Sequence, residues 1–302
     1  MKAAAFDYAR PASLDEACAM LGQSEDARLI AGGQTLVPLM AMRLARPRQL
    51  IDIARLAELT FIRDEGDAVA IGAATRQCVV ERDALVRVKL PLLARIMPYV
   101  GHAATRARGT IGGSLANADP AAELALVAVT LGATLSYRNG DTSADIAAAD
   151  FFLGPMVTAV PPTGCVTGVR FPVWRAANDS RIGIGFHEIS ARQSDFAFAS
   201  AAAQIEVDAA DVCRRVVLAI GGVTAVSLRL AAVESALPTT SPPAGRMRER
   251  VGELVRDALD DTAVEWLADL HASAAFRRRV AVTLATRAVV DAWAEARGPH
   301  AR

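Results

Sequence analysis

The sequence predicts an α+β protein built from two domains, and three observations lead to this prediction. In the first part of the chain, a strand and a glycine turn lead toward a helix, and such a glycine turn occurs twice. Beyond residue 181 the pattern changes to a run of strands followed by amphipathic helices. Between these parts, residues 173–180 have little apolar periodicity, which is typical of a domain boundary.

The composition indicates a globular protein with a large core. The 302 residues include 33 Lys plus Arg and 33 Asp plus Glu, so the formal charge is zero. Because such a chain has no excess of basic residues to attract phosphates, we expect no nucleic-acid partner. Hydrophobic residues make up 52% and charged residues 22%, which excludes the disordered and low-complexity classes.

Neither a membrane segment nor an export signal is predicted. The longest markedly apolar stretch, residues 124–135, is interrupted by Thr130 and Gly132 and is shorter than the about 20 residues that cross a bilayer. Near the start of the chain, the charged Asp7 lies where an export signal needs its apolar region. We therefore predict a cytoplasmic protein.

The first predicted helix begins at a capping box, in which Ser13 and Glu16 satisfy free N–H groups of a helix that runs to about residue 21. A strand over residues 28–31 then leads into the first glycine turn, and apolar residues recur at helical spacing over residues 36–44. The elements predicted next are a short strand over residues 49–53, a hairpin over 59–73 and helical patterns over 75–99.

The second glycine turn, residues 109–114, leads toward an apolar helix over residues 121–131. Asp119 is predicted to be the N-cap of this helix, with Pro120 in its first turn, where the missing N–H does no harm. The dipeptide Asn139-Gly140 between two strand-like stretches predicts a hairpin. A strand from residue 164 then ends at Pro172.

The second domain is predicted to contain strands over residues 181–190, 196–207 and 216–220, followed by amphipathic helices over 247–259 and 276–294. Residues 238–245, between the strands and the helices, are rich in Pro, Thr and Ser and are predicted to form a surface loop.

Several motifs that carry chemistry are absent from the sequence. Residues 183–188 begin like the dinucleotide fingerprint GxGxxG, but Glu188 replaces its third glycine. There is no GxxxxGK[ST] and no HExxH, and the four cysteines and four histidines are scattered. We interpret the cysteines as reduced thiols, and we predict neither a catalytic side chain nor a metal site.

The remaining signal is the pair of glycine turns, Gly32-Gly33 and Gly112-Gly113, about 80 residues apart. Adjacent glycines lack Cβ atoms, so several backbone N–H groups can approach an anion, and a helix N-terminus adds partial positive charge. Two such turns could hold one pyrophosphate. Taken alone, either turn is more often a tight connection that binds nothing, so the flanking residues decide between these interpretations.

Two segments extend this signal into longer matches. Residues 31–40 read AGGQTLVPLM and are followed by MRLARP and LIDI, and residues 108–124 read RGTIGGSLANADPAAEL. Both resemble the flavin-binding segments of the FAD-binding medium subunits of molybdenum hydroxylases, which include the carbon monoxide dehydrogenase medium chain and the xanthine dehydrogenase flavin domain. FFLG at 151–154, VRFP at 169–172 and DFA at 195–197 are similar to later landmarks of that family.

The resemblance implies a two-part α/β FAD-binding domain of the vanillyl-alcohol-oxidase (PCMH) type and a smaller C-terminal α+β domain. The expected boundaries are 1–176 for the first domain, with subdomains of about 1–57 and 58–176, and 177–302 for the second. The resemblance also implies an oxidoreductase subunit that binds FAD, takes electrons from [2Fe–2S] clusters of a small partner subunit and passes them to an external acceptor.

The partners implied by the resemblance are this small [2Fe–2S] subunit and a large subunit that holds the molybdenum cofactor, in a dimer of heterotrimers. Subunits of this family serve carbon monoxide, purines, N-heteroaromatics and aldehydes, and the resemblance does not choose among them. Two alternatives stay open: a non-catalytic scaffold with the same fold, and a free-standing FAD-dependent oxidase.

The resemblance also implies which residues surround FAD. The first glycine segment wraps the pyrophosphate, the second lies by the phosphates and the flavin, Glu123 contacts the adenosine part and Val166 packs against FAD. Carboxylate oxygens suit the ribose hydroxyls. The predicted set is Ile30, Ala31, Gly32, Gly33, Gln34, Thr35, Leu36, Val37, Thr110, Gly112, Gly113, Ser114, Glu123, Val166 and His187.

His187 marks a departure from the family. Many relatives carry Lys or Arg one or two residues after the phenylalanine that matches Phe186, where a cation stabilises the anionic reduced flavin; here His187 and Glu188 occupy these positions. His187 either serves as that cation when protonated or is a strand histidine without a role.

Other polar residues near the second glycine segment receive weaker predictions. Arg106 and Arg108 flank the second glycine turn and either contact a phosphate or are solvated loop arginines, which is the commoner case. At most one of Tyr99, His102 and Asn117 is expected to face the flavin.

Overall fold

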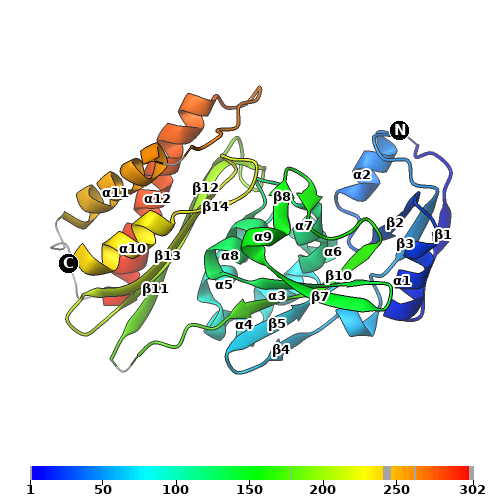
Figure 1. Ribbon diagram of the computed structural model, residues 1–302, viewed down its shortest axis with the longest axis horizontal. Coiled ribbons are helices and arrows are strands. Elements are labelled where there is room, and N and C mark those ends of the chain that lie inside the picture. Colours follow the sequence, from blue (N-terminus) through cyan, green and yellow to red (C-terminus); the bar gives the residue numbers. More distant parts are fainter. Residues whose placement is uncertain (1, 178, 241–245, 262, 299–302) are drawn as a thin grey trace.

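The computed structural model describes residues 2–177, 179–240, 246–261 and 263–298. Figure 1 shows three sheets that follow one another along the long axis, from the N-terminal sheet through a central sheet to the C-terminal sheet. The predicted boundaries at residues 57 and 176 fall between these sheets. In the described part of the chain, every helix is too short or too polar to traverse a bilayer.

The N-terminal sheet is parallel, with β3 (Gln49–Asp52) between β1 (Asp7–Ala9) and β2 (Ala27–Ile30). Helix α1 (Leu14–Gly22) begins at the predicted cap, where Ser13 Oγ accepts the Glu16 N–H at 3.1 Å. The Glu16 carboxylate in turn accepts the Ala12 N–H at 2.6 Å. These bonds confirm the predicted start of the helix.

The central sheet is antiparallel and contains five strands in the order β4-β5-β10-β6-β7. Its strands are β4 (Ile62–Asp64), β5 (Ala68–Gly72), β10 (Gly164–Pro172), β6 (Thr134–Asn139) and β7 (Thr142–Ala147). Both predicted hairpins are confirmed, and the loop of the second is Gly140-Asp141, because Asn139 already pairs with Thr142. A small hairpin, β8 (Phe152–Gly154) and β9 (Val157–Thr158), lies apart from this sheet.

Short helices fill the connections of the first domain. They are α2 (Leu36–Ala41), α3 (Gln77–Arg82), α4 (Ala84–Lys89), α5 (Pro91–Ile96), α6 (Ala103–Arg108), α7 (Ile111–Asn117), α8 (Glu123–Leu131) and α9 (Ala148–Phe151), with 3-10 turns at Ala57–Leu59 and Met97–Tyr99. The helical pattern over residues 75–99 is divided because Asp83 caps α4 through the Val86 N–H at 3.0 Å, and Pro91 begins α5.

Two predictions around the second glycine segment are wrong. Gly112 and Gly113 lie inside the first turn of α7 rather than in a loop, and Thr110 is its N-cap. Asp119 is not the N-cap of α8, because its side chain accepts the Ala121 N–H at 2.9 Å in the preceding turn. The helix begins only at Glu123.

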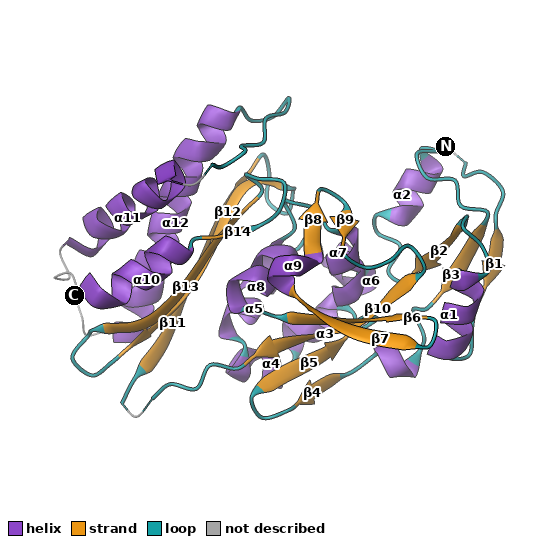
Figure 2. Ribbon diagram, viewed as in Figure 1, coloured by secondary structure: helices purple, strands orange, loops and turns teal. Residues whose placement is uncertain are grey.

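The C-terminal sheet is antiparallel and contains β11 (Arg181–Ser190), β12 (Ala197–Val207), β13 (Cys213–Gly221) and β14 (Leu228–Arg229) in chain order. Figure 2 shows α10 (Ala231–Thr240), α11 (Met247–Asp261) and α12 (Ala274–Arg297) on its outer side. Helix α10 was not predicted, and Pro238 lies within it; residues 241–245 of the predicted loop lie outside the described residues.

The inner face of the C-terminal sheet packs against the first domain. Helices α5 and α8 contact this face, and Ile184, Phe186 and Ala202 share one buried core with them. Every residue of α8 is buried, as expected for a helix whose residues are apolar except Glu123 and Thr130. The two domains are therefore joined by a continuous hydrophobic junction.

Candidate functional site

A cavity of about 750 Å³ lies where the N-terminal sheet, the central helices and the C-terminal domain meet. One wall is the first glycine turn, a second is the start of α7, and a third is residues 194–196, which precede β12. Its volume lies within the range of ligand and cofactor sites. Segments from both domains thus enclose one space.

The first glycine turn offers free donors to this cavity. In the described part of the chain, the backbone N–H groups of Gly32, Gly33, Gln34 and Thr35 donate to no protein acceptor. Gly33 has a φ of 69°, a left-handed conformation that favours glycine, and the Gln34 side chain donates to the Gly32 carbonyl at 3.1 Å. Successive free N–H groups on such a turn form an anion-binding concavity.

The second glycine segment contributes differently from the first. Its backbone donors are used within the protein, since the Gly112 N–H bonds to Ala73 O at 2.9 Å and the Gly113 N–H to Thr110 Oγ1 at 3.1 Å. A Cβ on Gly112 would lie 2.4 Å from the Ala73 Cβ. The prediction that both turns present free amides is therefore corrected for this segment, which contributes a close backbone surface and the Ser114 side chain.

The two glycine segments pack directly on each other. A Cβ added to Gly32 would lie 2.6 Å from Arg108 O and 2.8 Å from Gly109 Cα. Arg76 and Thr110 form an isolated antiparallel bridge beside this contact. Residues that are about 80 positions apart in sequence are thereby fixed in one wall of the cavity.

Glu123 is a buried acid that lines the cavity at the start of α8, with 7% of its surface exposed. Burial raises its pKa to about 8, and the charges of Glu188 and Asp119 act in the same direction. At neutral pH the side chain is mostly a neutral carboxylic acid, which can donate one hydrogen bond as well as accept others. Hydroxyl groups of a ligand suit such a partner.

Glu188 lies close enough to influence this acid. Side chains alternate along β11, so Glu188 shares the inner face of the sheet with Ile184 and Phe186. Its Oε2 atom is buried without a hydrogen-bond partner among the described residues, and burial raises its pKa to about 7. The junction between the domains therefore contains two carboxyl groups whose charged forms are both disfavoured.

The structure brings together all but two of the residues predicted to bind the cofactor. Val37 lines a neighbouring cavity instead, beyond the glycine turn. The residues that line the main cavity are Ile30, Ala31, Gly32, Gly33, Gln34, Thr35, Leu36, Thr110, Gly112, Gly113, Ser114, Glu123 and Val166.

His187 is the second exception, and it lines neither cavity. Its Nε2 atom lies 2.8 Å from Asp291 Oδ2 on α12, on the outer side of β11. Beside it, Gly183 and Gly185 explain the partial GxGxxG motif, because a Cβ on either would lie 1.9 Å from a carbonyl oxygen of α12. These glycines serve close packing of helix on sheet rather than a dinucleotide.

Several lining residues were missed or given another role. His102 and Asn117 both line the cavity, whereas Tyr99 stacks edge-on against Phe186 with ring centroids 4.8 Å apart. Residues 194–196 also line it, and the DFA landmark at 195–197 was the available signal, although no cofactor contact was predicted from it. Their contribution depends on the docking of the second domain, which no local pattern describes.

Arg106 is not a solvated loop arginine. Its guanidinium is buried, forms an ion pair with Glu81 at 2.9 Å and donates to Gly101 O at 2.7 Å. It therefore holds the chain that precedes the second glycine segment.

The wall chemistry fits a dinucleotide such as FAD. Free amides suit a diphosphate, the neutral acid Glu123 suits ribose hydroxyls, and Val100 and Val166 add apolar surface. Helices α2 and α7 have only six and seven residues, so the attraction for an anion comes from the free N–H groups rather than from a long helix dipole.

Two family models together match most of the chain. Residues 4–174 match the FAD binding domain in molybdopterin dehydrogenase. Residues 185–292 match the CO dehydrogenase flavoprotein C-terminal domain. The first match alone covers more than half of the chain.

Two similar proteins match nearly the whole chain. The nicotine 6-hydroxylase medium subunit of Paenarthrobacter nicotinovorans is 31% identical over 296 residues, which are 97% of this chain and 99% of that protein. The carbon monoxide dehydrogenase medium chain of Hydrogenophaga pseudoflava is 30% identical over 96% of this chain and 97% of that protein.

Solved structures agree with these matches. A chain of carbon monoxide dehydrogenase from Hydrogenophaga pseudoflava, in a form that lacks the Mo-pyranopterin moiety of the molybdenum cofactor, superposes with a TM-score of 0.90 at 31% identity and covers 98% of this chain and 100% of that chain. A chain of quinoline 2-oxidoreductase from Pseudomonas putida 86 gives 0.89 at 29% identity, with 98% and 99% covered. The fold and the resemblance predicted from the sequence are thus confirmed: the chain belongs to the family of FAD-binding medium subunits of molybdenum hydroxylases.

Proposed function

We propose that the cavity between the two domains holds one FAD, with its diphosphate on the first glycine turn. The observation that carries this proposal is the row of four free backbone N–H groups, at Gly32, Gly33, Gln34 and Thr35, beside the cavity. A diphosphate can accept hydrogen bonds from these N–H groups. No carboxylate of the described residues accepts a hydrogen bond from them.

The remaining wall residues orient the cofactor. The Ser114 hydroxyl lies on the opposite glycine segment and can donate to a phosphate oxygen or the flavin side of the molecule. Glu123, held neutral by burial, exchanges hydrogen bonds with ribose hydroxyls. Val166 packs against the bound cofactor, and residues 194–196 limit the access of water from the side of the C-terminal domain.

FAD, when bound, supplies a redox centre that exchanges electrons singly or in pairs. We infer that the chain relays electrons from [2Fe–2S] clusters of a small partner subunit to an external acceptor. A large partner subunit with a molybdenum cofactor would hydroxylate the substrate, in a dimer of heterotrimers. The full-length similarity to medium subunits of other hydroxylases supports this arrangement. A cytoplasmic location stays a prediction.

Flavin content tests the cofactor assignment directly. Purified protein is expected to be yellow and to release one equivalent of FAD on denaturation. Gly33→Val is expected to lose the cofactor, because a β-branched residue is strained at a φ of 69° and its side chain would meet Val37. Gly154→Val is the matched control, since nothing lies within 4 Å of its Cβ position.

The outcomes separate the alternatives. A colourless wild-type protein that cannot be reconstituted with FAD would favour a scaffold, and full flavin content in folded Gly33→Val would contradict the placement of the diphosphate. Purification together with large and small subunits supports the electron-transfer role, whereas a flavin-loaded chain that oxidises an alcohol alone would favour a free-standing oxidase.

A further inference from the structure

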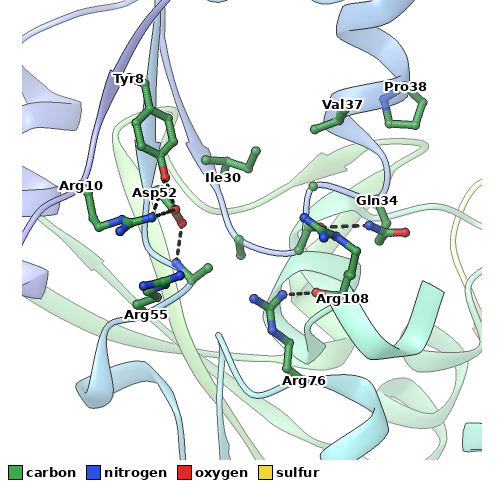
Figure 3. A pocket seen from close by; sticks show the side chains of 14 residues that line it. Tyr8, Arg10, Ile30, Gln34, Val37, Pro38, Asp52, Arg55, Arg76 and Arg108 are labelled. Atoms are coloured by element: carbon green, nitrogen blue, oxygen red, sulfur yellow. Dashed lines mark hydrogen bonds and ion pairs between the residues drawn. The ribbon is translucent and has the colours of Figure 1, made fainter. Parts of the chain in front are cut away.

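A second cavity, of about 610 Å³, lies on the other side of the first glycine turn. It shares residues 30–34 with the main cavity, but none of the second glycine segment from Thr110 onward lines it. Figure 3 shows Arg10, Asp52 and Arg55 on one side of this space and Arg76 and Arg108 on the opposite side. The glycine turn therefore separates two spaces with different walls.

The charges that line the second cavity do not balance. Its wall carries four arginines and a single carboxylate, that of Asp52. Asp52 is already engaged: it lies 3.8 Å from the Arg10 guanidinium, accepts the Tyr8 hydroxyl and accepts the Ala54 N–H at 2.9 Å. This carboxylate can offset the charge of Arg10 but not those of the remaining arginines.

The other three arginines have no anionic partner. Within the described ranges, no carboxylate lies within ion-pair distance of Arg55, Arg76 or Arg108, whereas arginines elsewhere in the chain pair with Glu81, Asp15 or Glu65. The Arg76 guanidinium donates to Arg108 O, which holds it at the cavity wall without neutralising it. Three positive charges thus line one cavity that is open to solvent.

We propose that the second cavity binds a phosphoryl anion, either a free phosphate or pyrophosphate or the phosphate group of a small nucleotide. Guanidinium groups form bidentate hydrogen bonds with phosphate oxygens, and their planar fork matches this geometry. An excess of three positive charges suits a phosphate or pyrophosphate better than a single carboxylate. This site shares residues 30–34 with the main cavity, but its four arginines do not line that cavity, and it takes a ligand of its own.

Titration calorimetry of the purified FAD-loaded protein, with any subunits that accompany it, tests this site. In phosphate-free buffer at low ionic strength, inorganic pyrophosphate is expected to bind saturably, and Arg55→Ala to weaken binding about tenfold, the loss typical of one charge-assisted hydrogen bond. Arg55 makes no side-chain bond within the described residues, so its removal should leave folding and flavin content intact. Arg82→Ala, which removes an exposed arginine of α3 outside the cavity, is the matched control and should bind normally.

Comparison of different phosphate ligands distinguishes the source of the anion. Tighter binding of AMP than of orthophosphate supports a nucleotide, and the reverse supports a free anion. The proposal is overturned if wild type shows no saturable binding, or if Arg55→Ala and Arg82→Ala behave alike. It is also overturned if Arg55→Ala loses FAD, because the arginines would then serve the flavin, or if only the separated chain binds pyrophosphate, because a partner subunit would then fill the cavity.

Discussion

His187 Nε2 lies 2.8 Å from Asp291 Oδ2, and this contact ties β11 to α12 on the side of the sheet that faces away from the main cavity. The next residue, Glu188, lies on the inner face instead. The position at which the family resemblance led us to consider a cation therefore contributes to the packing of the C-terminal domain, and its neighbour adds a buried carboxyl to the junction.

His187→Gln is accordingly expected to leave the flavin midpoint potential unchanged. Loss of a partly exposed pair with Asp291 should lower the free energy of unfolding by less than about 1 kcal/mol. Spectroelectrochemical titration of wild type and variant checks the first expectation, and urea unfolding the second. A shift of the midpoint potential beyond about 30 mV, which is a tenfold change in the equilibrium constant of a two-electron couple, would show that the ring acts on the flavin.

The FAD-free protein is expected to lose stability as the pH rises from about 4.5 to 8. Burial raises the pKa of Glu123 to about 8, so the folded state binds a proton there that the unfolded state has already released. This stabilisation is complete below the unfolded pKa and disappears as the pH passes the folded value. Glu188 adds a similar dependence up to about pH 7.

Glu123→Gln should flatten this dependence, with the clearest difference from wild type between pH 7 and 8. Urea unfolding at steps from pH 5 to 8.5 measures it, with the exposed Glu25→Gln as control. The difference between wild type and Glu123→Gln across the range is expected to be on the order of a few kcal/mol. Parallel curves for the two proteins would show that Glu123 is ionised in the fold.

Gly185→Ala is expected to destabilise the protein by at least about 2 kcal/mol, because the new methyl group would lie 1.9 Å from Ala288 O of α12. Gly252→Ala in α11 provides the contrast, since its Cβ would make only ordinary contacts, and removal of a helical glycine stabilises by about 0.5–1 kcal/mol. Thermal unfolding of both variants tests the packing of α12 on β11. Equal melting temperatures would contradict it.

Thr110→Val is expected to cost about 1 kcal/mol of stability and to speed the release of FAD. Thr110 Oγ1 accepts the Gly113 N–H at 3.1 Å and so caps α7 beside the cavity. Thr110→Ser keeps this acceptor and should restore both properties, which separates loss of the cap from a general change in packing. Flavin dissociation can be followed by the recovery of FAD fluorescence.

Local sequence signals predicted the elements whose causes are local. The Ser13 capping box, the strand over residues 181–190 and both hairpins of the central sheet appear as predicted, because a cap, an alternating pattern or a tight turn involves neighbours in the chain. The two glycine segments were also identified from the sequence. Their interpretation as one binding site came from a family resemblance that extends well beyond them.

The features that were missed depend on contacts between distant residues. Helix α10 keeps Pro238 in a helix because Val233 and Leu237 are buried against the sheet, so packing outweighs the preference of proline. Position 112 in the first turn of α7 is a glycine because Ala73 leaves no room for a side chain, and Arg106 is buried because Glu81 lies beside it. None of these partners is visible in a short window of sequence.

Residues 194–196 of the C-terminal domain line the main cavity together with residues of the first domain, so the two domains share whatever ligand the cavity binds. By thermodynamic linkage, ligand binding strengthens the association of the two domains. The association of the domains strengthens ligand binding by the same free energy. A fragment that stops at residue 176 would keep the glycine turns and still bind its cofactor more weakly than the whole chain.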